Sequence, residues 1–242
     1  MNKKHQSRDA RTAKAARAAN LARQRQRQRT LWISVIAVVA LVLAGLTGWA
    51  IYASQQPVDY AVPANTTADE AGLVDGDGPV TVEIWLDFHC PACQTFEEAS
   101  APALDALVDE GTITRVYYPV SFLDRASTTE FSTRSAASAA CAADGGAHEQ
   151  YVQALLAVQP PQGGAALSND DLIQVGESVG LTDPAFAECV RDQQYRSWTR
   201  HATDHAAQQG VTRTPTVRVN GEEVPPLTEA VLEAVEDAQA GS

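Results

Sequence analysis

The sequence feature that most constrains the fold is a pair of cysteines, Cys90 and Cys93, placed between a predicted strand and a predicted helix. Residues 80–88 are rich in Val, Ile, Trp, Leu and Phe, which indicates a largely buried strand. Residues 94–108 are compatible with a helix. If that helix begins at the first cysteine, its unpaired N–H groups and positive dipole end stabilise the Cys90 thiolate. The arrangement therefore predicts a redox pair that exchanges disulfides with other proteins.

The elements after this motif predict an α/β fold with a helical insertion. Residues 113–120 form a second expected strand, and a strand–helix–strand unit favours a parallel pair. Strands at 216–219 and 222–224 flank Asn220-Gly221, which favours a type I′ hairpin. A final helix is expected from Thr228. Between these parts, about residues 124–210, the sequence predicts helices at 132–143, 148–158, 168–179 and 184–209, the last with a break near Asp192.

The N-terminal region predicts a membrane anchor. Residues 1–30 carry ten of the 18 Lys+Arg and form a basic tail. Residues 31–53 contain no charged side chain and, at about 1.5 Å per residue, would reach roughly 35 Å as a helix, enough for a bilayer core of about 30 Å. Basic residues before the span predict a cytoplasmic N-terminus and an extracytoplasmic remainder. A cleavable signal is the alternative, but no clear Ala-x-Ala site follows the apolar run.

The remainder of the chain is acidic and predicts a linker followed by one domain. Residues 54–78 contain Pro, Gly, acidic and small residues, which indicates a linker, and residues 79–242 would form the domain. The net charge is −12 even with the basic tail, so an acidic domain argues against nucleic acid as a partner. His201 and His205 have a zinc-compatible spacing, but no third ligand is evident nearby, so we expect a solvated helix face and no metal or organic cofactor.

All four cysteines lie on the side predicted to be extracytoplasmic, where disulfides are common. Four cysteines allow three pairings. The proximity of Cys90 and Cys93 favours their bonding to each other, which would leave Cys141 with Cys189. A two-residue loop gains little stability from a bridge, so the close pair favours redox activity over a structural role.

The order of these elements resembles the thioredoxin fold in its DsbA-like form, and most closely the membrane-anchored DsbA-like thiol–disulfide oxidoreductases of actinobacteria. The resemblance covers about residues 79–240. It depends on Asp-Phe-His-Cys-Pro-Ala-Cys at 87–93 and on Thr-Pro-Thr at 214–216 before the hairpin.

The resemblance implies a role for each matching residue. Cys90 would be the nucleophile and Cys93 the resolving cysteine. Pro215 would be a cis-proline beside the disulfide, and Thr214 would offer backbone hydrogen bonds to an extended substrate. The same resemblance implies a structural disulfide between Cys141 and Cys189. Apart from the resemblance, we expect His89, Pro91 and Ala92, which flank or separate the catalytic cysteines, to contact the substrate. His89 could also tune the Cys90 thiolate through its charge, or be only a polar residue at the strand end.

One position departs from the family pattern. Many relatives have a carboxylate six residues before the first cysteine, where it exchanges protons with the resolving thiol, and this chain has Ile84 there. Glu83 is one residue out of phase and should point to the opposite face of the strand. The sequence therefore leaves open whether Glu83, Asp87 or neither residue serves as the proton relay.

The function that follows is disulfide formation in exported proteins outside the cytoplasmic membrane. Its partners would be reduced exported proteins and, as the resemblance implies, a membrane reoxidase of the VKOR or DsbB type. A reductase or isomerase could use the same site. A copper chaperone binding through His89, Cys90 and Cys93 is a different class, but it would leave Thr214-Pro215 without a purpose. A cell-surface adaptor with an inactive fold would not require an intact cysteine pair.

Overall fold

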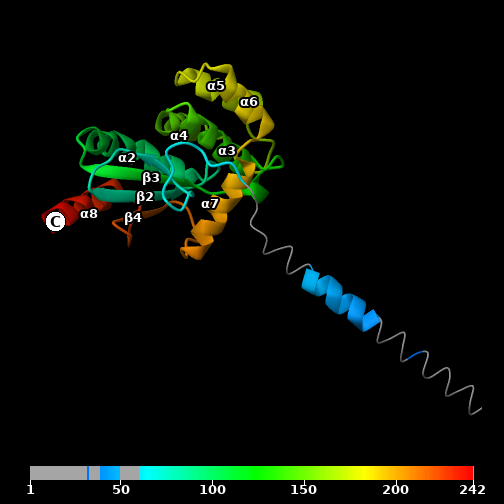
Figure 1. Cartoon of the computed structure of the whole chain (residues 1–242). Helices are drawn as coiled ribbons and strands as arrows, with labels where there is room; N and C mark the ends of the chain where they lie inside the picture. The colour runs from blue at the N-terminus through cyan, green and yellow to red at the C-terminus, as the bar shows by residue number, and fades with distance from the viewer. Residues whose placement is uncertain (1–31, 33–38, 50–59, 242) are drawn as a thin grey trace, which may run out of the picture. The chain divides into compact units, whose positions relative to one another are not determined.

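In a computed structural model that describes residues 32, 39–49 and 60–241, the predicted strand–helix–strand unit surrounds the cysteine pair. Strand β2 (Val80–Leu86) leads into helix α2 (Pro91–Asp109), which returns through β3 (Ile113–Pro119) parallel to β2. Figure 1 shows these elements in the middle of the domain. The parallel pair is confirmed, and it places the start of α2 at the carboxyl end of β2.

A five-stranded sheet extends this unit on both sides, in the order β1-β3-β2-β4-β5. Strand β4 (Thr216–Val219) is antiparallel to β2, and β5 (Glu222–Val224) is antiparallel to β4. Between them, Asn220 and Gly221 have φ of 48° and 85°. Two consecutive positive φ values are what a type I′ turn requires, so the hairpin prediction is confirmed.

The sheet buries both faces because the side chains of β2 alternate between two hydrophobic clusters. Val82, Ile84 and Leu86 belong to the larger cluster, which also contains both active-site cysteines. Trp85 points to the other face, where it stacks on Tyr118 with ring centroids 4.7 Å apart. Helices α2 and α8 (Thr228–Ala240) contribute to the first cluster, and α7 contributes to the second.

The helical insertion consists of five helices and a short 3₁₀ turn at Asp124–Ala126. The helices are α3 (Phe131–Asp144), α4 (His148–Ala157), α5 (Asn169–Ser178), α6 (Pro184–Asp192) and α7 (Arg196–Gln208). Ser168 and Asp171 form a capping box at the start of α5, and Gln193 adopts φ 52° between α6 and α7, where the sequence predicted a break. Figure 1 shows α5 and α6 stacked beyond α3 and α4, away from the sheet.

The linker predicted at 54–78 is wrong for the part that the structure describes. Strand β1 (Leu73–Asp75) pairs antiparallel with β3, and Ala71 and Leu73 are fully buried. Gly72 permits the close approach, because a Cβ at this position would lie 2.5 Å from Val116 Cγ1. The Pro, Gly and acidic residues suggested a linker, yet a few small or apolar side chains suffice to dock the segment on an open sheet edge.

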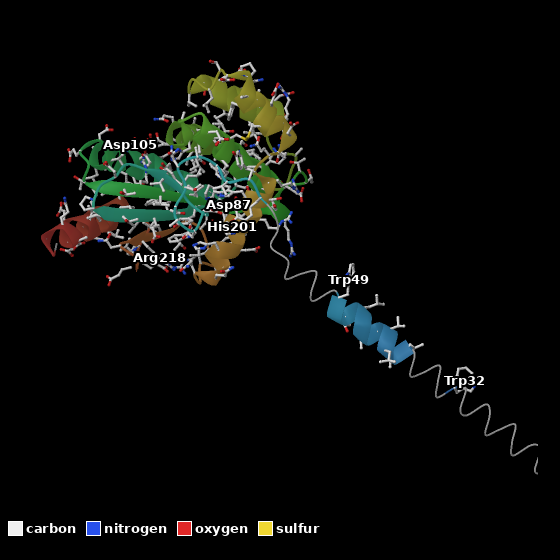
Figure 2. The ribbon with its side chains drawn as sticks, viewed as in Figure 1. Trp32, Trp49, Asp87, Asp105, His201 and Arg218 are labelled. Atoms are coloured by element: carbon white, nitrogen blue, oxygen red, sulfur yellow. A yellow bond between two sulfur atoms is a disulfide. The ribbon has the colours of Figure 1, made fainter. Side chains whose placement is uncertain are left out.

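Helix α7 contacts the same N-terminal segment, which corrects the expectation of a solvated histidine face. The ring of His201 stacks on Tyr60 with centroids 4.5 Å apart, and its Nε2 lies 2.9 Å from the Asp69 carbonyl oxygen. His205 Nε2 lies 3.4 Å from Asp69 Oδ2. His201 is labelled in Figure 2. The two histidines therefore help to hold residues 60–70 against α7.

Part of the predicted N-terminal organisation lies outside the described residues. Residues 39–49 are helical, whereas 1–31, 33–38 and 50–59 are not described. These ranges include the basic tail, both ends of the 31–53 span and the start of the linker. In the part of the chain that the structure describes, none of the helices has both the length and the apolar character needed to cross a bilayer. The membrane anchor remains a prediction.

Candidate active site

Helix α2 begins at the cysteine pair. Cys90 is its N-cap residue, with an extended backbone at φ −98° and ψ 110°, and Pro91 occupies the first helical position, where its missing N–H costs nothing. The amide of Cys93 donates to the Cys90 carbonyl oxygen at 3.0 Å. Cys90 therefore lies at the positive end of a 19-residue helix, with the first unpaired N–H groups beside its sulfur.

The two thiols have opposite acidities. The pKa of Cys90 is lowered from 9.0 to about 5, first by its hydrogen bond with the Cys93 thiol and then by Thr214 and the backbone N–H groups of Cys93 and Ala92, which together outweigh burial. Burial, followed by the hydrogen bond and charge of Cys90, raises the pKa of Cys93 far above its ordinary value. Both cysteines are unbridged in this structure. At neutral pH, Cys90 is a thiolate and Cys93 is a thiol.

The Thr214–Pro215 peptide bond lies opposite this pair. It is cis, and Cys90 Sγ lies 3.3 Å from the Thr214 carbonyl oxygen, to which it donates a hydrogen bond when it is protonated. Residues more than 120 positions apart in the chain thus meet at one sulfur atom, because β4 pairs directly with β2. Thr214 is half-buried and Pro91 and Ala92 are exposed, so these three residues surround Cys90 on its accessible side. Substrate contact at these residues remains a prediction.

His89 does not belong to that surface, which corrects its assignment as a substrate-contacting residue. Its side chain is fully buried and packs edge-on against Phe131, with ring centroids 5.2 Å apart. Neither ring nitrogen has a hydrogen-bond partner among the described residues. His89 precedes the N-cap residue Cys90, and its inward side chain packs on Phe131 at the start of α3.

Two glutamines after α4 hold the backbone that precedes the pair. Gln159 Nε2 donates to the carbonyl oxygens of Phe88 and Cys90 at 2.8 and 3.1 Å, and Gln162 Nε2 donates to the His89 carbonyl oxygen at 2.7 Å. The sequence analysis did not identify them. Only the Pro160-Pro161 pair between them marks the segment as an ordered turn, so the helical insertion positions the active-site loop in a way that no local motif reveals.

Asp87 is a second organising residue, and it is fully buried. Its Oδ1 accepts from the Ser132 hydroxyl at 2.6 Å and from the His89 amide at 2.8 Å, and its Oδ2 accepts from the Leu123 amide at 2.9 Å. Burial raises the pKa of Asp87 to about 6, although these three hydrogen bonds oppose the shift. Asp87 joins the active-site loop to the start of the helical insertion.

Glu83 lies on the opposite face of the sheet from the cysteines, as the strand alternation predicts. It shares that face with Trp85, over which the Arg218 guanidinium lies 4.7 Å from the ring centroid. Burial raises the pKa of Glu83, with the Arg218 charge and a hydrogen bond from Tyr118 acting against it. Figure 2 labels Arg218 on this side of the domain. The sheet separates Glu83 from Cys93, so this carboxyl does not reach the resolving thiol.

A buried carboxyl that the sequence analysis missed lies on the cysteine side. Glu97, on α2, is 3% exposed, and its Oε1 accepts from the Tyr117 hydroxyl at 2.6 Å. Burial raises its pKa, and the hydrogen bond from Tyr117 acts against that shift. The spacing of four residues from Cys93 was the available signal, because residues i and i+4 share one helix face.

The second cysteine pair forms a disulfide between two helices. Cys141 of α3 and Cys189 of α6 are bonded with a Cα–Cα distance of 5.9 Å, 48 residues apart in the chain. Both residues belong to the hydrophobic core cluster. Neither cysteine lies at a helix N-terminus, because Cys141 is in the last turn of α3 and Cys189 is inside α6. The bridge joins α6 to the body of the domain.

Comparisons with known proteins agree with this geometry. A family model described as thioredoxin matches residues 73–237. A crystal structure of oxidised DsbA from Mycobacterium tuberculosis is 30% identical, with a TM-score of 0.59, and the match covers 73% of this chain and 91% of that one. The reduced form of the disulfide bond oxidoreductase DsbG from the same organism is 32% identical, with a TM-score of 0.55, over 66% of this chain and 77% of that one.

One curated relative is a much longer protein. The Na⁺/H⁺ antiporter NhaA 3 of Salinispora tropica is 30% identical over 171 residues, which are 70% of this chain. The chain spans only 24% of the length of that antiporter. The match therefore concerns one part of the antiporter, and ion transport is not transferred to the present chain.

Proposed function

The chain belongs to the thioredoxin family and is a DsbA-like thiol–disulfide oxidoreductase, and from this premise we propose that it introduces disulfide bonds into exported proteins. The observation that carries the proposed direction is the difference between the two thiols. A Cys90 pKa of about 5 makes the reduced form stable and the Cys90 sulfur a good leaving group. Both properties favour a protein that gives its disulfide away.

The proposed reaction has two exchange steps. A substrate thiolate attacks Cys90 Sγ of the Cys90–Cys93 disulfide, the bond between the two protein sulfurs breaks, and its electron pair goes to Cys93 Sγ, which takes a proton. A second substrate thiolate then attacks the substrate sulfur of the mixed disulfide, and Cys90 leaves as a thiolate. The substrate has lost two electrons and has gained a disulfide, and the enzyme is left reduced.

The proposed location is the outer side of the cytoplasmic membrane. The support is the basic tail 1–30 followed by the uncharged segment 31–53, which together predict a single span with a cytoplasmic N-terminus. Reoxidation of Cys90 and Cys93 then requires an electron acceptor at that membrane, for which we propose a VKOR- or DsbB-type enzyme. After intact cells are treated with a membrane-impermeant reductant, a membrane-impermeant thiol reagent should label Cys90, and Cys90→Ser should abolish that label. Labelling only after lysis would refute the proposed location.

The direction is tested by the reduction potential of the cysteine pair in the full chain, equilibrated with glutathione. A value near that of DsbA, about −120 mV, supports disulfide donation. A value near that of thioredoxin, about −270 mV, would instead make the protein a reductase. The second measurement is the recovery of activity by a reduced, unfolded disulfide protein when the oxidised enzyme is added in stoichiometric amount.

The other functions considered from the sequence have less support. An isomerase would use the same sulfurs, and the acidity of Cys90 alone does not favour it over an oxidant. A copper chaperone would need both sulfurs as ligands, with His89 beside them. Cys93 is 2% exposed and the ring of His89 is fully buried, so these two side chains do not share an accessible site with Cys90.

A further inference from the structure

Two side chains outside the cysteine motif hold the backbone that carries Cys90. We propose that Gln159 and Gln162 are positioning residues for the exchange reaction: by holding the carbonyl groups of residues 88–90, they keep the Cys90 sulfur beside the N–H groups at the start of α2. This inference rests on the proposed exchange at Cys90 and Cys93. It gives the helical insertion a part in setting how strongly the enzyme oxidises its substrates.

The three consecutive carbonyl groups before α2 all accept hydrogen bonds from these glutamines. Gln159 Nε2 donates to the carbonyl oxygens of Phe88 and Cys90 at 2.8 and 3.1 Å. Gln162 Nε2 donates to the carbonyl oxygen of His89, the residue between them, at 2.7 Å. The bonded residues are 69–73 positions apart in the chain. These contacts therefore form only when the helical insertion packs against the active-site loop.

The N–H groups of the same loop are held by Asp87. The His89 N–H donates to Asp87 Oδ1 at 2.8 Å, and the Cys90 N–H donates to the Asp87 carbonyl oxygen at 2.9 Å. Asp87 is fully buried and is labelled in Figure 2. Each of the two peptide groups that flank His89 thus has its carbonyl bonded to a glutamine and its N–H bonded to Asp87. Neither peptide plane can rotate without breaking a hydrogen bond.

The orientation of these peptide planes determines where the Cys90 sulfur lies. Cys90 is the N-cap of α2, with φ −98° and ψ 110°, so its own dihedral angles are not those of the helix. Its carbonyl oxygen accepts from the N–H groups of Cys93 and Gln94 at 3.0 and 3.3 Å, in addition to Gln159. A rotation at Cys90 would move its sulfur relative to the first N–H groups of the helix.

The position of the sulfur matters because its donors stabilise a negative charge. The Cys93 thiol lowers the pKa of Cys90 most, and Thr214 and the N–H groups of Cys93 and Ala92 lower it further, to about 5. Hydrogen bonds weaken steeply when their angles change. The sulfur carries this charge only in the reduced protein, so a displaced sulfur destabilises the reduced form more than the oxidised form. The glutamines therefore favour the reduced form, and with it the donation of the disulfide.

The segment that carries the two glutamines is itself held in place. Pro160 and Pro161 lie between them and fix two consecutive φ angles at about −65°. The Gly163 N–H donates to the Ala126 carbonyl oxygen at 2.7 Å, which ties the segment to the 3₁₀ turn. Gly163 has φ 98°, a conformation that glycine adopts without strain. A supported segment can position the active-site loop, because its own side chains are not free to follow the loop.

The simpler alternative is that the glutamines only stabilise the fold. Gln159 is half-buried, and removing its amide would leave two carbonyl groups without this donor, which costs free energy of unfolding. Such a role would destabilise the reduced and oxidised forms alike. It would leave the acidity of Cys90 unchanged. A measurement on the Cys90 thiol therefore separates the two roles.

The test is a titration of Cys90 in the reduced full chain, followed by the ultraviolet absorbance of the thiolate. The unmodified protein should have a midpoint near pH 5. Gln159→Met has a side chain of similar length without the donor, and it should raise the midpoint by about one pH unit, a tenfold fall in the ratio of thiolate to thiol. Gln162→Met frees only the His89 carbonyl and should give a smaller shift. Gln174→Met, at an exposed site on α5, is the matched control and should leave the midpoint unchanged.

The reduction potential of the cysteine pair gives a second readout. A tenfold change in the equilibrium of a two-electron couple is about 30 mV, so Gln159→Met should lower the potential at pH 7 by about this amount. Unchanged midpoints and potentials in folded Gln159→Met and Gln162→Met would overturn the inference. If Gln159→Met does not fold, Gln162→Met decides: a raised midpoint supports the inference, and an unchanged one overturns it.

The same measurements distinguish this inference from the proposed function. If the unmodified protein forms no reversible Cys90–Cys93 disulfide, the proposed function fails, and the Cys90 midpoints still test the role of the glutamines. If the disulfide forms but neither glutamine variant changes the midpoint, the proposed function stands and the positioning role is refuted.

Discussion

The two cysteine pairs of this protein have the same atoms and opposite environments. Cys90 and Cys93 lie at the start of α2, where helix N–H groups and Thr214 stabilise one sulfur and burial penalises the other. Cys141 and Cys189 lie away from any helix start, in the packed interior of the helical insertion, and join two helices 48 residues apart. The thiols of the first pair differ in pKa, whereas the sulfurs of the second pair are bonded to each other. Reactivity therefore follows from position relative to a helix N-terminus and not from the presence of a disulfide.

The largest expected effect is the difference in disulfide-exchange rate between variants of the two cysteine pairs. Cys90→Ser should reduce disulfide exchange with dithiothreitol to the uncatalysed level, because the sulfur that forms the mixed disulfide is absent. The double variant Cys141→Ala/Cys189→Ala should keep an exchange rate close to that of the unmodified protein. Loss of exchange in a folded double variant would show that the second pair takes part in the reaction, and the contrast between the pairs would fail.

The same double variant should also show that the Cys141–Cys189 disulfide contributes more to the free energy of unfolding than the Cys90–Cys93 disulfide does. In the chain-entropy model, a bridge between residues 48 apart contributes about 4 kcal/mol to the free energy of unfolding. For a chain of this size, that corresponds to a fall in Tm of roughly 8–16 °C. Calorimetry of both proteins measures it. Reducing only the Cys90–Cys93 bond of the unmodified protein serves as the control, because its two-residue loop constrains the unfolded chain far less.

The acidity of Cys90 predicts a pH dependence that the second pair cannot show. Its pKa falls from 9.0 to about 5 on folding of the reduced protein, so the unfolded state binds more protons between these values. The stability of the reduced form relative to the oxidised form should therefore rise between about pH 5 and 9, and the comparison is made from about pH 7 upward, above the Asp87 pKa of about 6. Urea unfolding of both redox forms tests this. A constant difference across that range would mean that the folded protein does not stabilise the Cys90 thiolate.

The smallest predicted effect concerns the support of the reactive pair. Ser132→Ala removes the 2.6 Å hydrogen bond to the buried Asp87 carboxylate and should lower the free energy of unfolding by about 1.5–3 kcal/mol at pH 8. The loss should be smaller at pH 4, because the pKa of Asp87 is about 6 and the carboxyl is then protonated. Ser178→Ala, at an exposed site on α5, should change stability little at either pH. Equal losses at the two pH values would argue against an ionised Asp87.

Local sequence patterns were sufficient for the elements that carry the reactive pair. The buried strand, the start of α2 at Cys90 and the Asn220-Gly221 hairpin depend on interactions within a few residues of each other, namely side-chain alternation, helix capping and backbone preference. The helix expected to begin at residue 168 is another such case, because Ser168 and Asp171 form a capping box there. Such local interactions depend little on the rest of the fold, and for that reason they can be predicted from the sequence.

Other features depended on neighbours that are distant in the chain. The inward turn of His89, its contact with Phe131 and the glutamine contacts to the loop arise when the helical insertion packs against β2 and α2. The docking of residues 60–75 depends on an open edge at β3. The pattern of apolar and polar residues in those segments does not indicate which distant residues will pack against them.

The sequence by itself indicated the candidate reactive sulfurs, two cysteines at a helix start, and the Thr-Pro pair that lies beside them. Tertiary structure alone decided which ionisable side chains are buried near them. Glu97 became a buried acid because the parallel register of β2 and β3 placed Tyr117 beside Ile84, opposite the inner face of α2. A pKa depends on burial and on charges within a few ångströms, and those distances are set by packing between elements and not by the order of residues along the chain.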